Sequence, residues 1–144
     1  MITKTLILIL SLMMGNVIAQ DSGKEEIIDL QGAWENELGS VFHIDSIATS
    51  GEIHGRYASS TGVDGKVFPM QGFINYTEEN PTEINVSFTV RWEGYGSITS
   101  WTGYVYKLEG KEKIKTMWHL VRSGKEYDWE RIITNSSTFT KLEE

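Results

Sequence analysis

The sequence predicts an all-β protein folded as an eight-stranded antiparallel up-and-down β-barrel, and three observations lead to this prediction. Runs in which apolar and polar residues alternate recur along the chain, which is the pattern of strands with one buried face. Short groups of Gly, Asn, Ser and charged residues separate these runs, as turns do. No run has the longer period of an amphipathic helix. Eight strands in consecutive hairpins close into a barrel, because closure removes the exposed edge strands.

Residues 1–19 have the features of a secretory signal peptide. Lys4 precedes an apolar run from residue 6 to residue 14, and the small residue Ala19 ends the segment. The apolar run is shorter than the ~20 residues that span a bilayer, which argues against a transmembrane anchor. We therefore expect cleavage before Gln20 and an exported protein, either secreted to the extracellular space or periplasmic.

The remaining chain has the length of one domain, with a loose N-terminal lead expected at residues 20–31 and the barrel at residues 32–142. It has no cysteine, so packing rather than disulfide bonds must stabilise an exported protein. The net charge of -7, with acidic and basic residues interspersed, argues against nucleic acid or an anionic membrane surface as a partner. Five Trp and six Tyr indicate a densely packed core or a binding site.

The alternation is clearest at residues 84–92, where Ile84, Phe88 and Trp92 share one parity and polar residues stand between them. Turn signals separate the other runs, at positions 49–52, 62–65, 80–81, 109–111 and 123–125. The eight expected strands, in chain order, are residues 32–38, 41–47, 52–59, 68–77, 84–92, 97–108, 113–121 and 129–141.

Three of these strands change from apolar to polar along their inward faces. The first runs from Trp34 to Asn36, Leu38 and Ser40, and the others end in the polar residues Tyr57, Ser59, Thr99 and Ser97. At the opposite end, Trp34, Phe88 and Phe139 are expected to close the barrel. A buried polar group without a partner costs about 1–3 kcal/mol, so something must satisfy these side chains. The pattern predicts a neutral pocket for a ligand with several donors and acceptors, such as a urea or an amide.

Five segments carry a resemblance to a known family: GAWENELGS (32–40), GRYASSTG (55–62), SITSWTGYV (97–105), TMWHLVRSG (116–124) and STFTKL (137–142). In their order and register, the chain resembles the avidin and streptavidin family of biotin-binding barrels over residues 32–142. The resemblance implies high-affinity, non-covalent binding of biotin as a ligand, with no cofactor, no metal and no enzymatic activity.

The resemblance also implies how the ureido group of biotin is bound. Asn36, Ser40 and Tyr57 match three donors that converge on the ureido oxygen, an arrangement similar to an oxyanion hole. Ser59 matches an acceptor for one ureido N–H. Ser137 stands where the family usually has an Asp or Asn that accepts the second N–H. An ionised acceptor forms a hydrogen bond about twice as strong as a neutral one, so Ser137 predicts weaker binding than in the tightest members.

Further roles follow from the same resemblance. Thr99 matches a hydroxyl that faces the thioether sulfur, and Ser97 with the backbone N–H of Val63 matches the group that holds the valeryl carboxylate. The residues that match the aromatic box and its apolar wall are Trp92, Trp101, Trp118, Leu38 and Leu120. Trp129 matches a Trp that each subunit inserts into its neighbour's site, which implies a homotetramer built as a pair of dimers.

Each of these residues also has a simpler interpretation. Taken alone, Trp92, Trp101 and Trp118 are more typical of an ordinary β core than of a ligand box. Asn36 and Ser40 are typical of residues that satisfy backbone groups at a turn.

Other functions stay open beside biotin binding, namely a structural or interaction domain and a binder of another small cyclic ligand. A lipocalin-like carrier of apolar ligands would be expected to have an apolar mouth. An enzyme has the least support, because His43, His54 and His119 do not have the spacing of metal ligands. Three N-glycosylation sequons, relevant only in a eukaryotic secretory pathway, begin at Asn75, Asn85 and Asn135.

Overall fold

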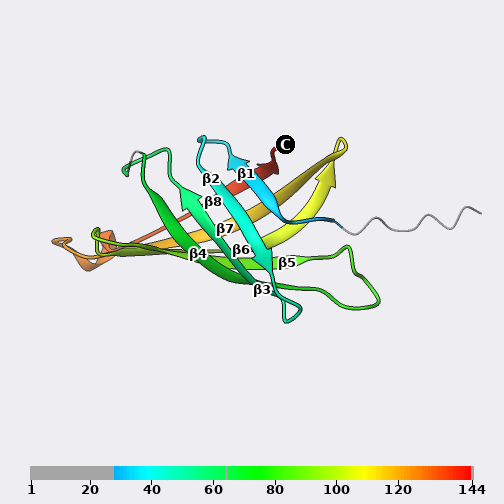
Figure 1. Ribbon diagram of the computed structural model, residues 1–144. Helices are drawn as coiled ribbons and strands as arrows, with labels where there is room; N and C mark the ends of the chain where they lie inside the picture. Colours follow the sequence, from blue (N-terminus) through cyan, green and yellow to red (C-terminus); the bar gives the residue numbers. More distant parts are fainter. Residues whose placement is uncertain (1–27, 64, 144) are drawn as a thin grey trace, which may run out of the picture.

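The computed structural model describes residues 28–63 and 65–143, and within them eight strands form one closed antiparallel barrel (Figure 1). A single 3₁₀ turn, η1, precedes the last strand. The elements are β1 (Gly32–Asn36), β2 (Val41–Ile47), β3 (Glu52–Ala58), β4 (Val67–Asn75), β5 (Asn85–Trp92), β6 (Ser97–Leu108), β7 (Lys111–Arg122), η1 (Asp128–Glu130) and β8 (Ile132–Lys141). The prediction of an eight-stranded up-and-down barrel is confirmed. The predicted signal peptide and its cleavage site lie outside the described residues.

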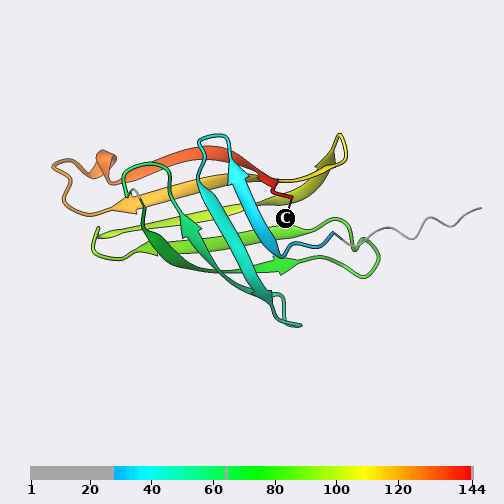
Figure 2. The same ribbon diagram turned by 45° about the horizontal axis from the view of Figure 1, so that its top comes forward.

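Each strand pairs with its neighbours in sequence, and β8 pairs with β1 to close the barrel, with Asn36 opposite Phe139. Because neighbouring strands are antiparallel, the connections alternate between two ends. The β1–β2, β3–β4, β5–β6 and β7–β8 connections meet at what we call the pocket end. The other connections and residues 28–31 lie at what we call the plugged end; Figure 2 shows the β6–β7 hairpin on that side. No helix in the described part of the chain is long and apolar enough to cross a membrane.

Four aromatic rings fill the barrel at the plugged end. Trp34, Phe42, Phe88 and Phe139 are each at most 2% exposed. Phe42 lies at the centre, with its ring centroid 4.9 Å from that of Phe88, 4.8 Å from that of Phe139 and 6.1 Å from that of Trp34. The expected closure by Trp34, Phe88 and Phe139 is therefore present, and Phe42 completes it.

Leu30 departs from the expectation of a loose N-terminal lead. Its side chain is 1% exposed, and its backbone carbonyl accepts a hydrogen bond from Trp34 Nε1 at 3.0 Å. A buried indole N–H needs an acceptor, and the turn before β1 supplies one. The end of the lead is therefore part of the plug.

Glycines within the strands allow neighbouring strands to approach closely, as at Gly72 and Gly103. A Cβ added to Gly72 on β4 would lie 1.9 Å from the carbonyl oxygen of Ser87, and one added to Gly103 on β6 would lie 1.8 Å from that of Lys115. Neither distance is compatible with a side chain. These residues are typical of glycines at which another backbone segment approaches closely.

The first and last strands are shorter than expected. The first ends at Asn36 rather than at residue 38, because a turn through Gly39, with φ at 80°, leads directly into β2. Leu38 is consequently in the turn and 65% exposed, rather than at an inward strand position. The last strand begins at Ile132, and Trp129, expected inside it, lies in η1.

Candidate functional site

The candidate site is a cavity of about 250 Å³ at the pocket end of the barrel. Thirteen of the fourteen side chains that the sequence analysis selected line it, and Trp129 is the exception. Leu38 reaches the cavity from the β1–β2 turn. No charged residue among the described ones lines the cavity. The site is therefore a neutral, polar and aromatic pocket, as expected from the inward strand faces.

Asn36 ends β1, and its side chain closes the turn that follows. Its Oδ1 accepts hydrogen bonds from the backbone N–H groups of Leu38, at 3.0 Å, and of Ser40, at 2.9 Å. Two backbone donors face this atom, so it must be the oxygen of the amide. Asn36 can therefore serve both the turn and a ligand. The turn uses the side-chain oxygen, and both N–H groups of Nδ2 are left to donate to a ligand.

Tyr57 is 4% exposed and packed between two indole rings. Its ring stacks on that of Trp101, with centroids 5.0 Å apart, and meets the ring of Trp92 edge-on at 5.6 Å. Burial raises the pKa of Tyr57 to about 12, although a hydrogen bond with Ser40 acts in the opposite direction and the charge of Glu37 adds slightly to the rise. The phenol is therefore protonated at neutral pH and able to donate.

The β1–β2 turn and the β3–β4 connection are joined by a pair of serines. Ser40 Oγ accepts the backbone N–H of Ser60 at 3.0 Å, and Ser60 Oγ donates to the carbonyl of Leu38 at 2.7 Å. Ser59 Oγ donates to the carbonyl of Thr61 at 2.8 Å. Because its proton is used there, Ser59 faces the cavity as an acceptor.

Two of the tryptophans hold hydroxyl groups in position. Trp92 Nε1 donates to Thr99 Oγ1 at 2.8 Å, and Trp118 Nε1 donates to Ser137 Oγ at 3.2 Å. An indole N–H is only a donor, so each hydroxyl oxygen is an acceptor in this contact and keeps its own proton for another partner. Asn135, on the same strand as Ser137, accepts the N–H of Ser136 and does not line the cavity.

Three residues that line the cavity were absent from the sequence-based selection, namely Thr61, Gly62 and Tyr95. All three lie in connections, where no strand parity indicates which side chains face inward. Tyr95 stands between two glycines in the β5–β6 connection, and this surrounding sequence gave no signal for its position.

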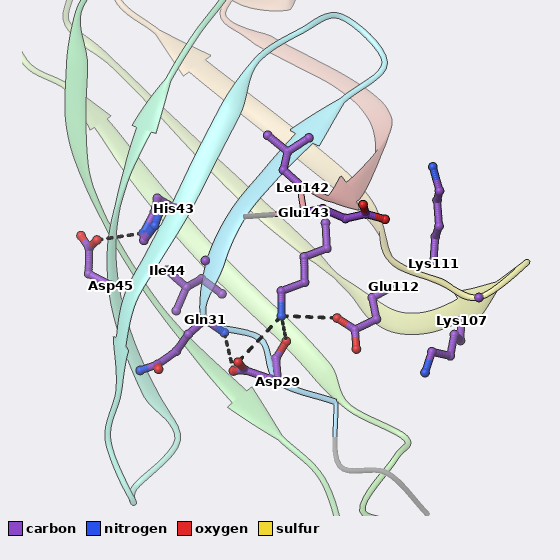
Figure 3. Close-up of a pocket in the computed structure, with 13 residues that line it drawn as sticks. Asp29, Gln31, His43, Ile44, Asp45, Lys107, Lys111, Glu112, Leu142 and Glu143 are labelled. Carbon is purple, nitrogen blue, oxygen red and sulfur yellow. Dashed lines mark hydrogen bonds and ion pairs between the residues drawn. The ribbon is translucent and has the colours of Figure 1, made fainter.

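A second, larger hollow of about 710 Å³ lies on the outside of the plugged end, and Figure 3 shows Asp29 and Glu112 next to one ammonium group, with Lys107 and Lys111 standing apart from that group. Lys141 Nζ lies 3.4 Å from Glu112 Oε2 and 3.9 Å from Asp29 Oδ2. His43 Nδ1 lies 2.9 Å from Asp45 Oδ1. Carboxylates thus engage both Lys141 and His43, and the smaller, uncharged cavity, which the predicted site residues line, is the better candidate for ligand binding. Across residues 28–63 and 65–143, no group of three or more His, Asp or Glu is arranged to hold a metal ion.

Comparison with known proteins agrees with the fold. The model of the avidin family matches residues 24–142, which is most of the chain. The chain belongs to the avidin family. Avidin from Gallus gallus is 33% identical over 146 residues, covering 97% of this chain and 94% of avidin. Avidin-related protein 4/5 from the same organism is 29% identical over 143 residues, with the same coverage.

Solved structures of the avidin family share the fold. The crystal structure of Xenavidin superposes with a TM-score of 0.70 at 35% identity, covering 81% of this chain and 100% of Xenavidin. The crystal structure of a shwanavidin variant in complex with biotin superposes with a TM-score of 0.65 at 30% identity, covering 80% of this chain and 99% of the other.

Proposed function

We propose that this protein binds biotin non-covalently and with high affinity in the cavity at the pocket end. The observation that carries the proposal is the convergence of Asn36, Ser40 and Tyr57 on one uncharged cavity, with the orientation of Asn36 dictated by its turn. Family membership and the biotin complex of a shwanavidin variant support it.

The ureido group of biotin fits the donors and acceptors that the folded chain leaves available. Asn36 Nδ2 and the protonated Tyr57 hydroxyl donate to the ureido oxygen, and the Ser40 hydroxyl does so after rotation about one bond. Ser59 and Ser137 accept the two ureido N–H groups. The donors are held by the protein before the ligand arrives, so little ordering is needed on binding.

Aromatic and apolar side chains surround the bicyclic ring in this proposal. Trp92, Trp101 and Trp118 form the box, with Leu38 and Leu120 beside them. Burying the ring stabilises the complex by about 25 cal/mol for each Å² of apolar surface removed from water. The Thr99 hydroxyl, whose oxygen accepts the Trp92 N–H, has its proton available for the thioether sulfur.

Ser137 sets the strength of one ureido contact. Its hydroxyl is neutral and already accepts the N–H of Trp118, so it is a weaker acceptor for the ligand than a carboxylate. We estimate a difference of about 1–2 kcal/mol, or about tenfold in affinity, from family members with Asp at this position.

A homotetramer with shared sites completes the proposal. Trp129 is 76% exposed and stacks on Tyr127, with ring centroids 5.8 Å apart, which is an unusual exposure for an indole. On the outer face, the paired residues Ile98, Val121 and Ile132 form an exposed aliphatic row across β6, β7 and β8. We propose that such surfaces are covered by neighbouring subunits and that Trp129 enters a neighbour's cavity.

Export is also part of the proposal, with cleavage before Gln20. N-terminal sequencing of the protein recovered from the medium or the periplasm tests it, and an N-terminus at Met1 would contradict it.

Isothermal titration of the purified protein with biotin, desthiobiotin and biotin methyl ester tests the function. We expect one ligand per chain, tight binding of biotin and weaker binding of the ester, because its carboxylate is masked. Absence of heat with all three, together with no retention on biotin-agarose, would favour a structural or interaction domain instead.

A further inference from the structure

The mouth of the cavity carries a lysine and a tyrosine that join two connections distant in sequence. Lys66 lies in the β3–β4 connection and Tyr95 in the β5–β6 connection. Lys66 Nζ donates to the Tyr95 hydroxyl oxygen at 2.7 Å and lies 4.9 Å from the centre of the Tyr95 ring. Tyr95 itself lines the cavity, so the ammonium group is held one hydrogen bond away from the cavity wall.

Packing fixes Tyr95 relative to the site. Its ring meets that of Phe68 edge-on at 6.2 Å, and Phe68 meets Trp92 in the same way at 5.1 Å. Phe68 is 5% exposed and Trp92 is 8% exposed, so the support of the Tyr95 ring extends into the core. The Tyr95 side chain is 43% exposed, and its contact with Phe68 places the phenol hydroxyl as an acceptor for Lys66.

The charge of Lys66 is available to a ligand. In the part of the chain that the structure describes, no carboxylate lies within ion-pair distance of Nζ. An ammonium group has three N–H donors, and the contact with Tyr95 uses one. No charged side chain among the described residues lines the cavity. The Lys66 ammonium, held next to Tyr95 in the cavity wall, therefore supplies a positive charge beside the cavity.

We propose that Lys66, positioned by Tyr95, recognises the anionic end of the ligand and makes the site select a carboxylate over a neutral or cationic group. This inference rests on the proposed function, in which the ring of biotin fills the cavity and its carboxylate lies at the mouth near Ser97 and Val63. The contact is exposed to solvent, so its effect on affinity is modest, about two- to fivefold, and declines as salt is added.

The test compares biotin with biotin methyl ester in the unmodified protein and in Lys66→Met, which keeps the apolar stem. We expect Lys66→Met to weaken biotin by about two- to fivefold at low salt and to leave the ester unchanged. Tyr95→Phe, which keeps the ring, is expected to lose part of the same preference. Lys111→Met is the matched control, since it removes one positive charge at the plugged end and should change neither ligand.

A charge reversal makes the test independent of any loss of packing. Lys66→Glu is expected to bind biotin more weakly and a biotin derivative with a terminal amine more tightly than the unmodified protein does. Equal losses for acid, ester and amine derivatives, or no change in any of them, would overturn the role of Lys66. If the unmodified protein binds neither biotin nor its ester, the biotin proposal itself fails, which is a different result from an unselective Lys66 variant.

Discussion

The two ends of this barrel use the same strands for opposite purposes. At the plugged end, Phe42, Phe88 and Phe139 contact one another, Trp34 stacks on Phe42, and all four rings are buried. At the pocket end, polar side chains such as Asn36 use one part of their hydrogen-bonding capacity on the protein and leave the other part unused. The plugged end therefore contributes mainly to the stability of the barrel, and the pocket end contributes mainly to ligand recognition. Substitutions at the two ends should therefore affect different measurements.

The largest expected effect is on the plug. Phe42→Ala removes the ring at its centre and should lower the free energy of unfolding by about 3–5 kcal/mol, measured by denaturant titration without ligand. Phe73→Ala is the control, because Phe73 on β4 is 59% exposed and should change stability by less than about 0.5 kcal/mol. Similar losses in both variants would contradict a plug centred on Phe42.

The next largest effect is expected at Trp129, which we propose enters the cavity of a neighbouring subunit. Trp129→Ala should release labelled biotin faster, corresponding to about 2–4 kcal/mol of binding free energy, as for buried Trp at interfaces. The variant should also form an assembly of lower molar mass, as measured by light scattering. Trp129→Phe should keep part of both properties. An unchanged dissociation rate and an unchanged mass would contradict the shared site.

Asn36 allows the turn and the ligand contact to be separated. Asn36→Asp keeps an oxygen for the N–H groups of Leu38 and Ser40 but has no donor for the ligand. It should fold with near-normal stability and bind biotin at least about thirtyfold more weakly, or about 2 kcal/mol. Asn36→Ala should lose both properties, with about 1–2 kcal/mol of stability. Normal biotin affinity in Asn36→Asp would contradict the donor role.

Because Tyr57 is buried, we expect the free energy of unfolding to depend on pH in the alkaline range. Its pKa is raised from 10.0 to about 12, so between these values the unfolded chain loses the proton while the folded protein keeps it. Stability relative to Tyr57→Phe is therefore expected to fall as pH rises from 10 to 12, by about 2–3 kcal/mol in all. Denaturant titrations of both proteins over this range provide the measurement, and parallel curves would contradict a buried, protonated phenol.

Ser137 is expected to have a smaller effect than these four, although a larger one than Lys66. Ser137→Asp should slow the dissociation of labelled biotin by about tenfold, because an ionised acceptor replaces a neutral one. Ser137→Ala, which removes the acceptor, should accelerate dissociation. If Ser137→Asp leaves the rate unchanged, Ser137 does not limit the affinity.

Strand parity explains how much of this molecule could be predicted from the sequence. A one-residue shift in strand register would move every side chain of that strand to the opposite face of the sheet. Trp34, Tyr57 and Thr99 could therefore be placed inside the barrel once the strands were recognised. The family resemblance added which of these side chains belong together. Leu38 was misplaced because the side chain of Asn36 competes with strand pairing and turns the chain.

The remaining features lie where parity gives no information. Lys66 and Tyr95 come from two connections and meet only through tertiary packing. Leu30 precedes the first strand, and its burial depends on the indole of Trp34 needing an acceptor. Trp129 lies in a short turn rather than in a strand. Lys66 and Tyr95 are thus joined by a contact between distant residues, whereas Leu30 and Trp129 lie outside the strands, where parity does not apply.

The double use of Asn36 has a consequence for how such a protein can diversify. A change of this residue that removes its side-chain oxygen also opens the first turn, so few substitutions here can alter carbonyl recognition alone. Ser137, Tyr95 and Lys66 have no comparable backbone duty in the contacts described above. New ligand preferences, whether natural or engineered, should therefore arise first in the last strand and at the cavity mouth.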